Sequence, residues 1–435
     1  MSRRPTAWRN WADTASCVPA RTERPVDAAA VAASLARARR DGLRVRPVGS
    51  GHSFTPLAVT DGVHVRLDRL AGVRSVDPDL GLAIVGAGTT LRTLADELAA
   101  RGFALAVLGD IDRQTVAGAV STGTHGTGRA AAALSAQVAG LQVVLPDATV
   151  ATCSADRDPQ LFHAARLGLG ALGVLTEVTL RVEPSYLLHA DEGPASFDQV
   201  LERFDDVLGS ADHVDLHWLP FTDTVQLKRW SRSPGPVRPL PRWRAWWEGV
   251  VVENAGLSLV QRIHRAAPAG VGPVNRVAAR LVSRRDLVDR SDRVFTSRRL
   301  VRFLEMEYAL PRGVAVPVLR SLRDLTVRGP WRPGFPVEVR SAPPDDVWLS
   351  TAHGRETVYV ACHAYPRTDH AAWFAACEEL FVAYGGRPHW GKLHTRTAAD
   401  LADAYPRFAD VRAARERADP ERLLANPHLE RILGP

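Results

Sequence analysis

A short glycine-rich segment, residues 48–54, constrains this chain more than any other part of the sequence. It reads Val-Gly-Ser-Gly-His-Ser-Phe and follows a strand-like stretch over residues 44–48. Such a loop exposes successive backbone N–H groups, which bind phosphate oxygens without a cation, and glycine lets the backbone touch a ligand. A plain phosphate loop has no need of His52. The segment therefore predicts a phosphate-bearing cofactor with an imidazole beside it; the alternative is a glycine-rich turn with a surface histidine.

Two further glycine segments support this prediction. Residues 121–128 read Ser-Thr-Gly-Thr-His-Gly-Thr-Gly, preceded by Gln-Thr-Val-Ala-Gly over residues 114–118, and Gly170-Ala-Leu-Gly-Val174 leads into a strand. Glycines and hydroxyl side chains together offer backbone and side-chain donors to a phosphate chain. A Gly/Thr surface turn remains the alternative for residues 121–128.

A different glycine motif, Gly86-Ala-Gly88-Thr-Thr-Leu91, follows a strand and opens a helix, as a dinucleotide fingerprint does. Leu91 occupies the position of the third glycine, which the helix of such a fold needs for packing against the strand. We therefore expect a tight strand-to-helix turn here and no NAD site.

Apolar periodicity divides the chain at about Pro184. Helical spacing is found over residues 27–41, 91–99, 197–208, 318–325 and 373–384. Strand patterns are found over residues 44–48, 82–85, 143–150 (a hairpin), 174–183, 214–218, 225–227, 301–308, 336–341 and 357–364. Hairpin-connected strands with helices on one side indicate an antiparallel sheet covered by helices. The predicted fold is α+β, with a cofactor domain (1–184), a substrate-binding cap domain (185–385) and a C-terminal segment (386–435) that returns to the active site. The Pro- and Arg-rich stretch 231–298 shows no interpretable period.

Composition describes a globular protein. Its four cysteines, Cys17, Cys153, Cys362 and Cys377, show no metal-binding or disulfide spacing, so we predict no metal site and a cytoplasmic location. No window reaches the ~18 apolar residues of a membrane-spanning helix. The net charge is +7, yet the basic residues are spread along the chain and no nucleic-acid-binding module is present. The basic, Trp-rich patch 228–247 predicts a surface loop, with peripheral membrane contact as the alternative.

Lysine usage singles out one residue before any motif is considered. Of the 55 basic residues only two are lysines, Lys228 and Lys392. A chain that otherwise uses arginine keeps lysine where a compact ammonium does what a guanidinium cannot. Lys392 ends the sequence His389-Trp-Gly-Lys392, and it is therefore a candidate functional residue.

Glu338-Val-Arg340 lies in an alternating strand, so the two charges share one face. They form either a structural ion pair or an acceptor and a fixed cation facing a cavity. Facing a cavity, the pair would offer an acceptor for a hydroxyl proton and a fixed positive charge that stabilises an anion.

These motifs resemble a known family. The glycine loops look like the FAD-binding domain of the vanillyl-alcohol-oxidase family of flavoproteins, over roughly residues 15–184. Within that family, His389-Trp-Gly-Lys392 and Glu338-Val-Arg340 resemble the signature of aldonolactone and alditol oxidases. Trp348-Leu-Ser350 and His353-Gly-Arg355 match the same subfamily.

The resemblance implies FAD as the cofactor, attached covalently through His52. It implies that Glu338 orients the reacting hydroxyl, that Arg340 stabilises the anionic reduced flavin and that Lys392 contacts flavin and substrate. The implied cofactor contacts are Val48, Gly49, Ser50, Gly51, His52, Ser53, Gly109, Asp110, Thr115, Gly118, Ser121, Thr122, Gly123, Thr124, His125, Val174, Leu175 and Lys392.

The implied reaction is oxidation of the C2 hydroxyl of an L-gulono-, L-galactono- or D-arabinono-1,4-lactone to an ascorbate-type product. The alternative is an alditol oxidase that attacks a terminal polyol hydroxyl, but Asp110 replaces the serine with which those enzymes touch a polyol. The implied electron acceptor is O₂, which Gly109 would admit, or a redox protein or quinone. A flavin-free carbohydrate-binding protein with the same fold is a third possibility.

Overall fold

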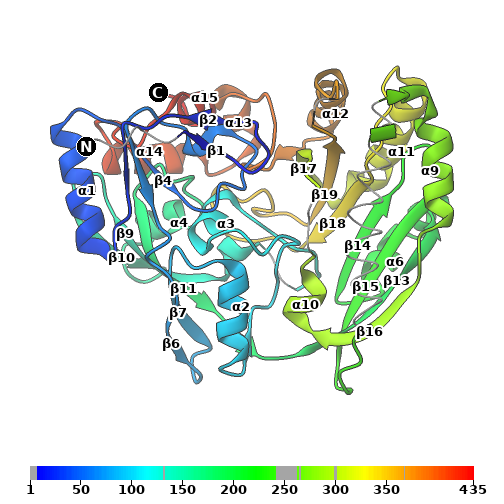
Figure 1. The fold of residues 1–435 in the computed structure, drawn as a ribbon, viewed down its shortest axis with the longest axis horizontal. Coiled ribbons are helices and arrows are strands. Elements are labelled where there is room, and N and C mark those ends of the chain that lie inside the picture. Colours follow the sequence, from blue (N-terminus) through cyan, green and yellow to red (C-terminus); the bar gives the residue numbers. More distant parts are fainter. Residues whose placement is uncertain (1–6, 131–132, 242–261, 264–265, 298–300, 367) are drawn as a thin grey trace.

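Two β-rich halves face each other across the middle of the molecule (Figure 1). The computed structural model describes residues 7–130, 133–241, 262–263, 266–297, 301–366 and 368–435. The N-terminal half contains a five-stranded antiparallel sheet in the order β10-β9-β11-β7-β6 and a three-stranded parallel sheet in the order β3-β5-β4. Their strands are β3 (Arg21–Glu23), β4 (Val45–Val48), β5 (Val63–Arg66), β6 (Val73–Asp77), β7 (Leu82–Gly86), β9 (Val138–Val144), β10 (Val150–Ser154) and β11 (Val174–Arg181). Two small sheets pair β1 (Trp8–Arg9) with β2 (Ser16–Cys17) and β8 (Phe103–Ala104) with β12 (Glu183–Pro184).

Helices of this half begin where a capping side chain precedes an apolar stripe. Asp27 accepts a hydrogen bond from the Ala30 N–H at the start of α1 (Ala28–Arg40), and such a cap satisfies a backbone donor that the helix itself leaves free. Thr90 and Thr115 cap α2 (Leu91–Ala99) and α3 (Val116–Thr122) in the same way. Asp158 likewise accepts a hydrogen bond from the Leu161 N–H at the start of α4 (Pro159–Ala165). The helices predicted at residues 27–41 and 91–99 are confirmed.

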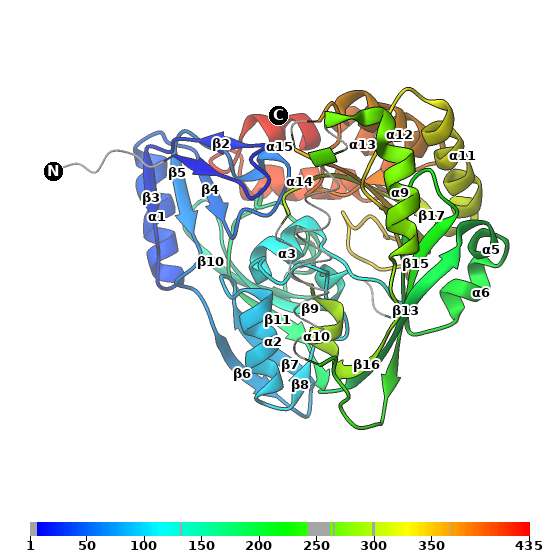
Figure 2. The same ribbon diagram turned by 45° about the vertical axis from the view of Figure 1, so that its right-hand side comes forward.

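The second half is built on an eight-stranded antiparallel sheet in the order β16-β13-β15-β14-β18-β19-β17-β20. Its strands are β13 (Leu187–Ser196), β14 (His213–Trp218), β15 (Thr224–Ser233), β16 (Arg285–Arg290), β17 (Leu304–Pro311), β18 (Val337–Ala342), β19 (Thr357–Ala364) and β20 (Arg387–Pro388). Its helices are α5 (Phe197–Glu202), α6 (Phe204–Gly209), α9 (Val271–Arg280), α10 (Ser291–Phe295), α11 (Ala315–Arg328) and α12 (Ala371–Ala383). Figure 2 shows α5, α6 and α11 on the outer side of this sheet.

The two faces of the large sheet differ in chemistry along β14, β18, β19 and β17. Successive side chains of a strand point to opposite faces. Leu216, Val339, Val360 and Met306 face the helices and form one hydrophobic core with them. The alternate positions carry Asp215, His217, Glu338, Arg340, Tyr359, His363, Glu305 and Glu307. We call these eight residues the polar face.

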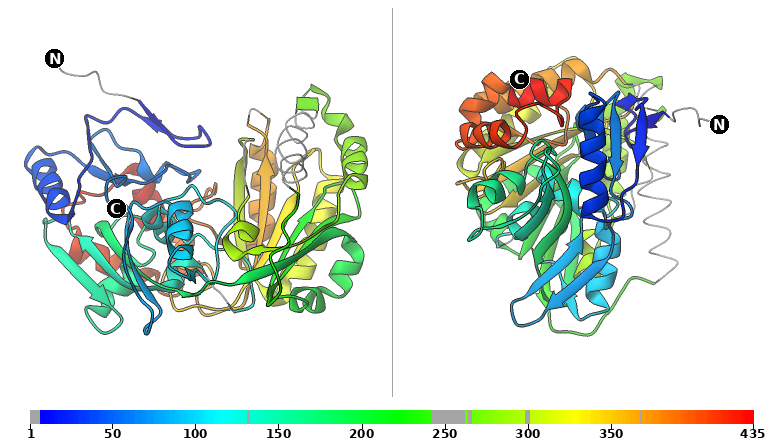
Figure 3. Two further views of the ribbon diagram at one scale, coloured as in Figure 1. Left: turned by 60° about the horizontal axis from the view of Figure 1, so that its bottom comes forward. Right: turned by 90° about the vertical axis from the view of Figure 1, so that its left-hand side faces the viewer.

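The C-terminal helices α13 (Ala398–Ala404), α14 (Phe408–Ala418) and α15 (Pro427–Leu433) pack onto the N-terminal half. Leu401, Val411 and Leu429 share a hydrophobic core with Val31 and Leu35 of α1, and the right-hand view of Figure 3 shows these helices beside the blue N-terminal elements. A return of the C-terminal segment to the cofactor domain is consistent with this packing. The domain boundaries at residues 184 and 385 stay predictions.

Several predictions need correction. The helix predicted over residues 197–208 is two short helices, because Arg203 leaves helical geometry at φ −121°. The patch 228–247 was predicted as a surface loop, but residues 228–233 belong to β15, and residues 242–261 lie outside the described part of the chain. Within 231–298, the described residues form α9, β16 and α10, which the sequence did not reveal.

Gly86 and Gly88 permit close backbone packing. A Cβ on Gly88 would lie 1.7 Å from the carbonyl oxygen of Leu67, and one on Gly86 would lie 2.4 Å from that of Leu70. The predicted strand-to-helix turn is therefore confirmed, and its glycines face the protein's own backbone. In the described part of the chain, no helix is long and apolar enough to cross a membrane.

Candidate cofactor and substrate cavities

A cavity of about 810 Å³ opens beside the glycine-rich loop of residues 48–53, and the wall opposite this loop includes Thr115, Gly118 and Ser121. A Cβ on Gly49 would lie 2.2 Å from Thr115 Oγ1, so only glycine lets the loop approach α3 this closely. Gly51 has a φ of 71°, in the left-handed region that favours glycine. The loop backbone is thereby held against the cavity, as the phosphate-binding prediction requires.

His52 lies where this cavity meets a second one. The ring of Trp11 stacks on it with centroids 5.8 Å apart, and its buried Nδ1 has no hydrogen-bond partner among the described residues. Burial lowers the pKa of His52 to about 4, and the charges of Arg113 and Lys392 add to the effect. The imidazole is therefore neutral at physiological pH and offers an unpaired nitrogen.

The second cavity holds about 1220 Å³ and lies between the two halves of the molecule. It shares His52, Ser53, Gln114 and Thr122 with the smaller cavity. An elongated ligand can therefore occupy both. Its far wall is formed by six residues of the polar face, namely His217, Glu305, Glu307, Glu338, Arg340 and His363.

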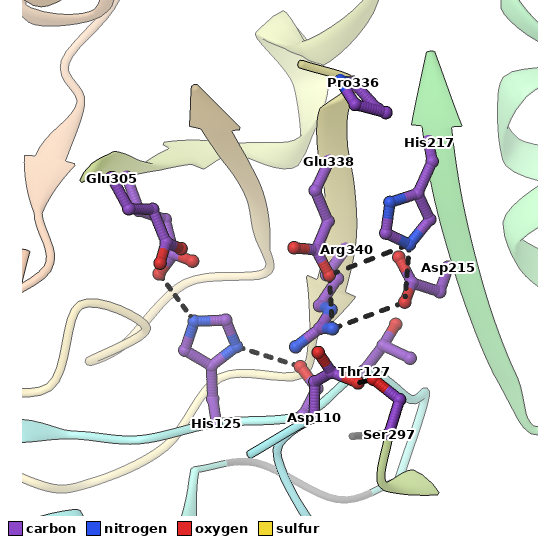
Figure 4. A network of polar contacts seen from close by, with 12 residues as sticks. Asp110, His125, Thr127, Asp215, His217, Ser297, Glu305, Pro336, Glu338 and Arg340 are labelled. Carbon is purple, nitrogen blue, oxygen red and sulfur yellow. Dashed lines mark hydrogen bonds and ion pairs between the residues drawn. The ribbon is translucent and has the colours of Figure 1, made fainter. Parts of the chain in front are cut away.

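Glu338 and Arg340 form an ion pair on β18, and both line the larger cavity. The sequence left open whether they form an ion pair or face a cavity, and in the structure they do both. Figure 4 shows them beside Asp215 and His217 of β14. Arg340 Nη2 lies 3.3 Å from Asp215 Oδ2, and His217 Nε2 lies 3.3 Å from the same oxygen. Burial would lower the pKa of Arg340, but Glu338 and Asp215 outweigh it and raise that pKa above its ordinary value. The guanidinium is a fixed cation.

Lys392 forms an ion pair with Glu305 of β17, and its Nζ lies 5.2 Å from the centre of the Phe54 ring. Burial lowers the pKa of Lys392, but the carboxylates of Glu305 and Glu307 outweigh it and raise the pKa above its ordinary value. The ammonium is therefore a second fixed cation in the larger cavity. The other lysine, Lys228, lies opposite Asp215 on β15 and is absent from the described lining.

Gly109 and Asp110 also line the larger cavity. Asp110 Oδ1 accepts a hydrogen bond from Ser297 Oγ at 2.6 Å, and the Asp110 backbone carbonyl accepts one from the Ser297 N–H at 3.1 Å. Asp110 is thus engaged in hydrogen bonds within the protein while it remains at the cavity wall.

The structure brings almost all the predicted site residues to these two cavities. Of the predicted cofactor contacts, Gly123 and Val174 line neither. Gly123 ends α3 with a φ of 76°, and the side chain of Val174 is buried in the core. The roles of the others stay predictions.

Sequence reasoning missed most of the polar face. Asp215, His217, Glu305, Glu307 and His363 were not predicted as site residues. A usable signal was present in β17, where two glutamates alternate with apolar residues in Leu-Glu-Met-Glu-Tyr, because a strand buried on both sides carries charge only where a partner or cavity receives it.

The residues present fit FAD. The glycine cradle, where a side chain would collide, suits the approach of a pyrophosphate. The unpaired Nδ1 of His52 at the junction of the cavities suits contact with the flavin. The cationic side chains of Arg340 and Lys392 in the larger cavity suit the negative charge that a reduced flavin carries.

Comparisons with known proteins agree. Residues 19–154 match the FAD binding domain family and residues 178–432 match the family described as D-arabinono-1,4-lactone oxidase. The chain is 40% identical over 428 residues to the L-gulono-1,4-lactone dehydrogenase of Mycobacterium tuberculosis, covering 98% of this chain and 99% of that one. It is 30% identical over 435 residues to the L-gulonolactone oxidase of Bos taurus, covering 98% of each.

Among solved structures, the fold is similar to a solvent-stable cholesterol oxidase, with a TM-score of 0.82 at 19% identity over 99% of this chain and 97% of that one. It is also similar to the cholesterol oxidase of Brevibacterium sterolicum, with a TM-score of 0.82 at 16% identity over 98% and 96%. At these identities the likeness concerns the fold, and it confirms the predicted two-domain α+β flavoprotein architecture. The family match covers more than half of the chain and the relatives span nearly all of it: the chain belongs to the D-arabinono-1,4-lactone oxidase family of FAD-dependent oxidoreductases.

Proposed function

We propose that this protein oxidises the C2 hydroxyl of a sugar-acid 1,4-lactone, such as L-gulono-, L-galactono- or D-arabinono-1,4-lactone, to a 2-keto product that enolises to an ascorbate-type compound. The observation that carries the proposal is the Glu338–Arg340 pair on the wall of a cavity that adjoins the glycine loops. The names of the relatives, lactone oxidases and dehydrogenases, support the same substrate class.

The pyrophosphate and the flavin of FAD would occupy different cavities. The pyrophosphate would lie in the smaller cavity beside residues 48–53, and the flavin in the larger one, which His52 and Lys392 both line. When bound, the flavin supplies the hydride acceptor. Every other contribution comes from side chains of this chain.

Glu338 would hold the reacting hydroxyl, since a carboxylate oxygen accepts a hydrogen bond from it and orients the C2 hydrogen. Arg340 and Lys392 would stabilise negative charge in the site, because both stay protonated and neither has to reorganise. The burial of Glu305, Glu307 and His389 keeps that wall away from bulk water, and this strengthens each interaction.

Asp110 favours a lactone over an alditol. A flexible polyol needs several directed partners to offset the rotor entropy that it loses on binding. Asp110 is already engaged by Ser297, so it is a poor replacement for a polyol-binding serine. A preformed lactone ring needs fewer partners.

The test is anaerobic bleaching of the visible flavin band with a panel of the three lactones, xylitol and sorbitol. We expect the lactones to reduce the flavin with higher kcat/KM than either polyol. The reverse order would assign the protein to the alditol oxidases, and absence of a flavin band from the purified protein would exclude both. The electron acceptor (O₂, a redox protein or a quinone) and the cytoplasmic location remain predictions.

A further inference from the structure

His125 and Glu307 meet between the two halves of the molecule. His125 follows α3, Glu307 lies on β17, and His125 Nε2 is 2.8 Å from Glu307 Oε1. Both side chains are buried and both line the larger cavity. Figure 4 shows His125 reaching from its loop toward the large sheet. The contact therefore joins the halves inside the proposed flavin site.

The partners of His125 fix how many protons its ring carries. Nδ1 lies 2.9 Å from the backbone carbonyl oxygen of Gly126, and Nε2 faces the carboxylate of Glu307. A carbonyl oxygen only accepts hydrogen bonds, so Nδ1 carries a hydrogen. Without a second proton, the lone pair of Nε2 would face a carboxylate oxygen, and two acceptors would meet at 2.8 Å. The pair therefore shares one additional proton.

The surroundings assign that proton to His125. Burial would raise the pKa of Glu307, but the charge and hydrogen bond of His125 and the charge of Lys392 outweigh it and hold the pKa well below its ordinary value. The ring of Tyr359 stacks on His125 with centroids 3.5 Å apart, and an aromatic face stabilises a cation. The contact is an imidazolium–carboxylate pair.

The neighbouring His389 differs. Its Nδ1 accepts a hydrogen bond from the Gly391 N–H at 3.0 Å, so the ring hydrogen is on Nε2. Burial lowers the pKa of His389 to about 4. Within the cluster of His125, Glu307 and His389, the imidazole charge is confined to His125.

We propose that Glu307 is a positioning residue that keeps His125 doubly protonated, so that a fixed imidazolium lies against the flavin in the larger cavity. This inference rests on the proposed function, because it takes FAD to occupy that cavity. A preorganised cation stabilises negative charge that develops on reduction. His125 would thus act together with Arg340 and Lys392.

The protonation state can be read without turnover. In holoenzyme labelled with ¹⁵N-histidine, both ring nitrogens of His125 should show imidazolium shifts at neutral pH, the signal being identified by its loss in His125→Gln. Glu307→Gln replaces an acceptor with an amide that can donate to Nε2, so His125 should become neutral with little change in shape. A neutral His125 in the wild type overturns the proposal.

The flavin midpoint potential gives an independent readout. Glu307→Gln should leave it nearly unchanged, because the variant removes the imidazolium together with the carboxylate and so alters no net charge. Glu305→Gln is the matched control on the same strand: it leaves Lys392 without its anion and should raise the potential. If His125 kept its proton in Glu307→Gln, the variant would gain a positive charge just as the control does, and a potential raised as in the control would therefore contradict the proposal.

Kinetics complete the test. In Glu307→Gln, anaerobic flavin reduction at saturating lactone should slow by about tenfold, with KM nearly unchanged. This decrease in rate is smaller than the one caused by removing a direct oxyanion donor. Equal kcat in variant and wild type contradicts the proposed role. The potential and the ¹⁵N spectrum require no lactone, so failure of lactones to reduce the wild-type flavin would contradict the proposed function alone.

Discussion

Asp215 and Arg340 lie directly opposite each other on the neighbouring strands β14 and β18, with Arg340 Nη2 3.3 Å from Asp215 Oδ2. Arg340 lines the larger cavity, whereas Asp215 is absent from its described lining. Asp215 therefore contacts the guanidinium from outside the cavity lining, whereas Glu338 contacts it from within that lining. Two carboxylates on one buried cation leave it little freedom, which is what a preorganised charge requires.

Asp215→Asn should destabilise the protein by about 3 kcal/mol at neutral pH, because it leaves a buried guanidinium with one carboxylate fewer. Burial raises the pKa of Asp215, but His217 and Arg340 outweigh it and hold that pKa well below its ordinary value. Such a group contributes stability above its unfolded pKa of about 3.9 and loses it as the pH falls below that value. Denaturant unfolding should therefore show the difference between wild type and variant narrowing below about pH 4. A constant difference would mean that the charge of Asp215 is unimportant.

His52 should carry a covalent bond to FAD. Its ring is neutral, with an unpaired Nδ1 at the junction of the two cavities, and a phosphate site alone gains nothing from such a group. Denatured wild-type protein should fluoresce as a band on a gel under ultraviolet light, and His52→Ala should lose that band. His64→Ala is a suitable control, since His64 is buried nearby but its Nε2 contacts the Ala58 carbonyl oxygen. Complete release of flavin from wild type by acid precipitation would show that the bond does not form.

Arg340 and Lys392 should each be needed for flavin reduction. Arg340→Ala removes a preorganised cation, and by analogy with oxyanion donors the loss is about 2.7–4 kcal/mol of transition-state stabilisation. Lys392→Arg should also be slow, because a planar guanidinium does not replace a compact ammonium between Glu305 and Phe54. Anaerobic stopped-flow reduction by a lactone measures both. Rates near wild type in both variants would leave these residues with a structural role.

The glycine loops could be predicted from sequence because their signal is local. Gly49, Gly51 and His52 lie within one short segment, so their pattern is recognisable even though the contact that requires Gly49 is with the distant Thr115, and Gly51 is required by its own positive φ. Glu338 and Arg340 were predicted for the same reason, since a period of two places them on one face.

The partners of these residues could not be predicted in the same way. His217 faces Glu338 only because β14 pairs with β18, more than a hundred residues later in the chain. Nothing local in either strand specifies that pairing. Glu307 contacts His125 because the two halves of the molecule pack against each other. This is a tertiary contact, and no periodicity in the sequence indicates it.

Arg46 should contribute more to the free energy of unfolding than a surface arginine does. Its buried guanidinium donates to the backbone carbonyls of Leu57, Leu169, Gly170 and Leu424, which come from three distant segments. Each buried acceptor left without a donor costs about 1–3 kcal/mol, so Arg46→Leu should lower the free energy of unfolding by about 4 kcal/mol. Arg44→Leu is the matched control, because the ion pair of the Arg44 side chain with Glu430 is exposed and is worth about 0–1 kcal/mol. Equal effects of the two substitutions in denaturant unfolding would contradict a clamping role for Arg46.

Gly109 should govern the reaction of the reduced enzyme with oxygen. In the resembling flavoproteins, a small residue at this place lets O₂ approach the flavin edge, whereas alanine tends to block it. A Cβ on Gly109 would lie 3.1 Å from both the His125 carbonyl oxygen and Thr124 Cγ2, a contact that shifts of a few tenths of an ångström relieve. Gly109→Ala should therefore fold, place a methyl group at the cavity wall, and slow reoxidation while lactone-driven reduction changes little.

Gly209→Ala, where the added Cβ meets nothing within 4 Å, controls for a general effect of the substitution. Stopped-flow mixing of each reduced protein with oxygenated buffer measures the difference. Equal reoxidation rates in wild type and Gly109→Ala would mean that oxygen reaches the flavin by another path, and a wild-type enzyme that barely reacts with oxygen would point to a redox protein or quinone as its electron acceptor.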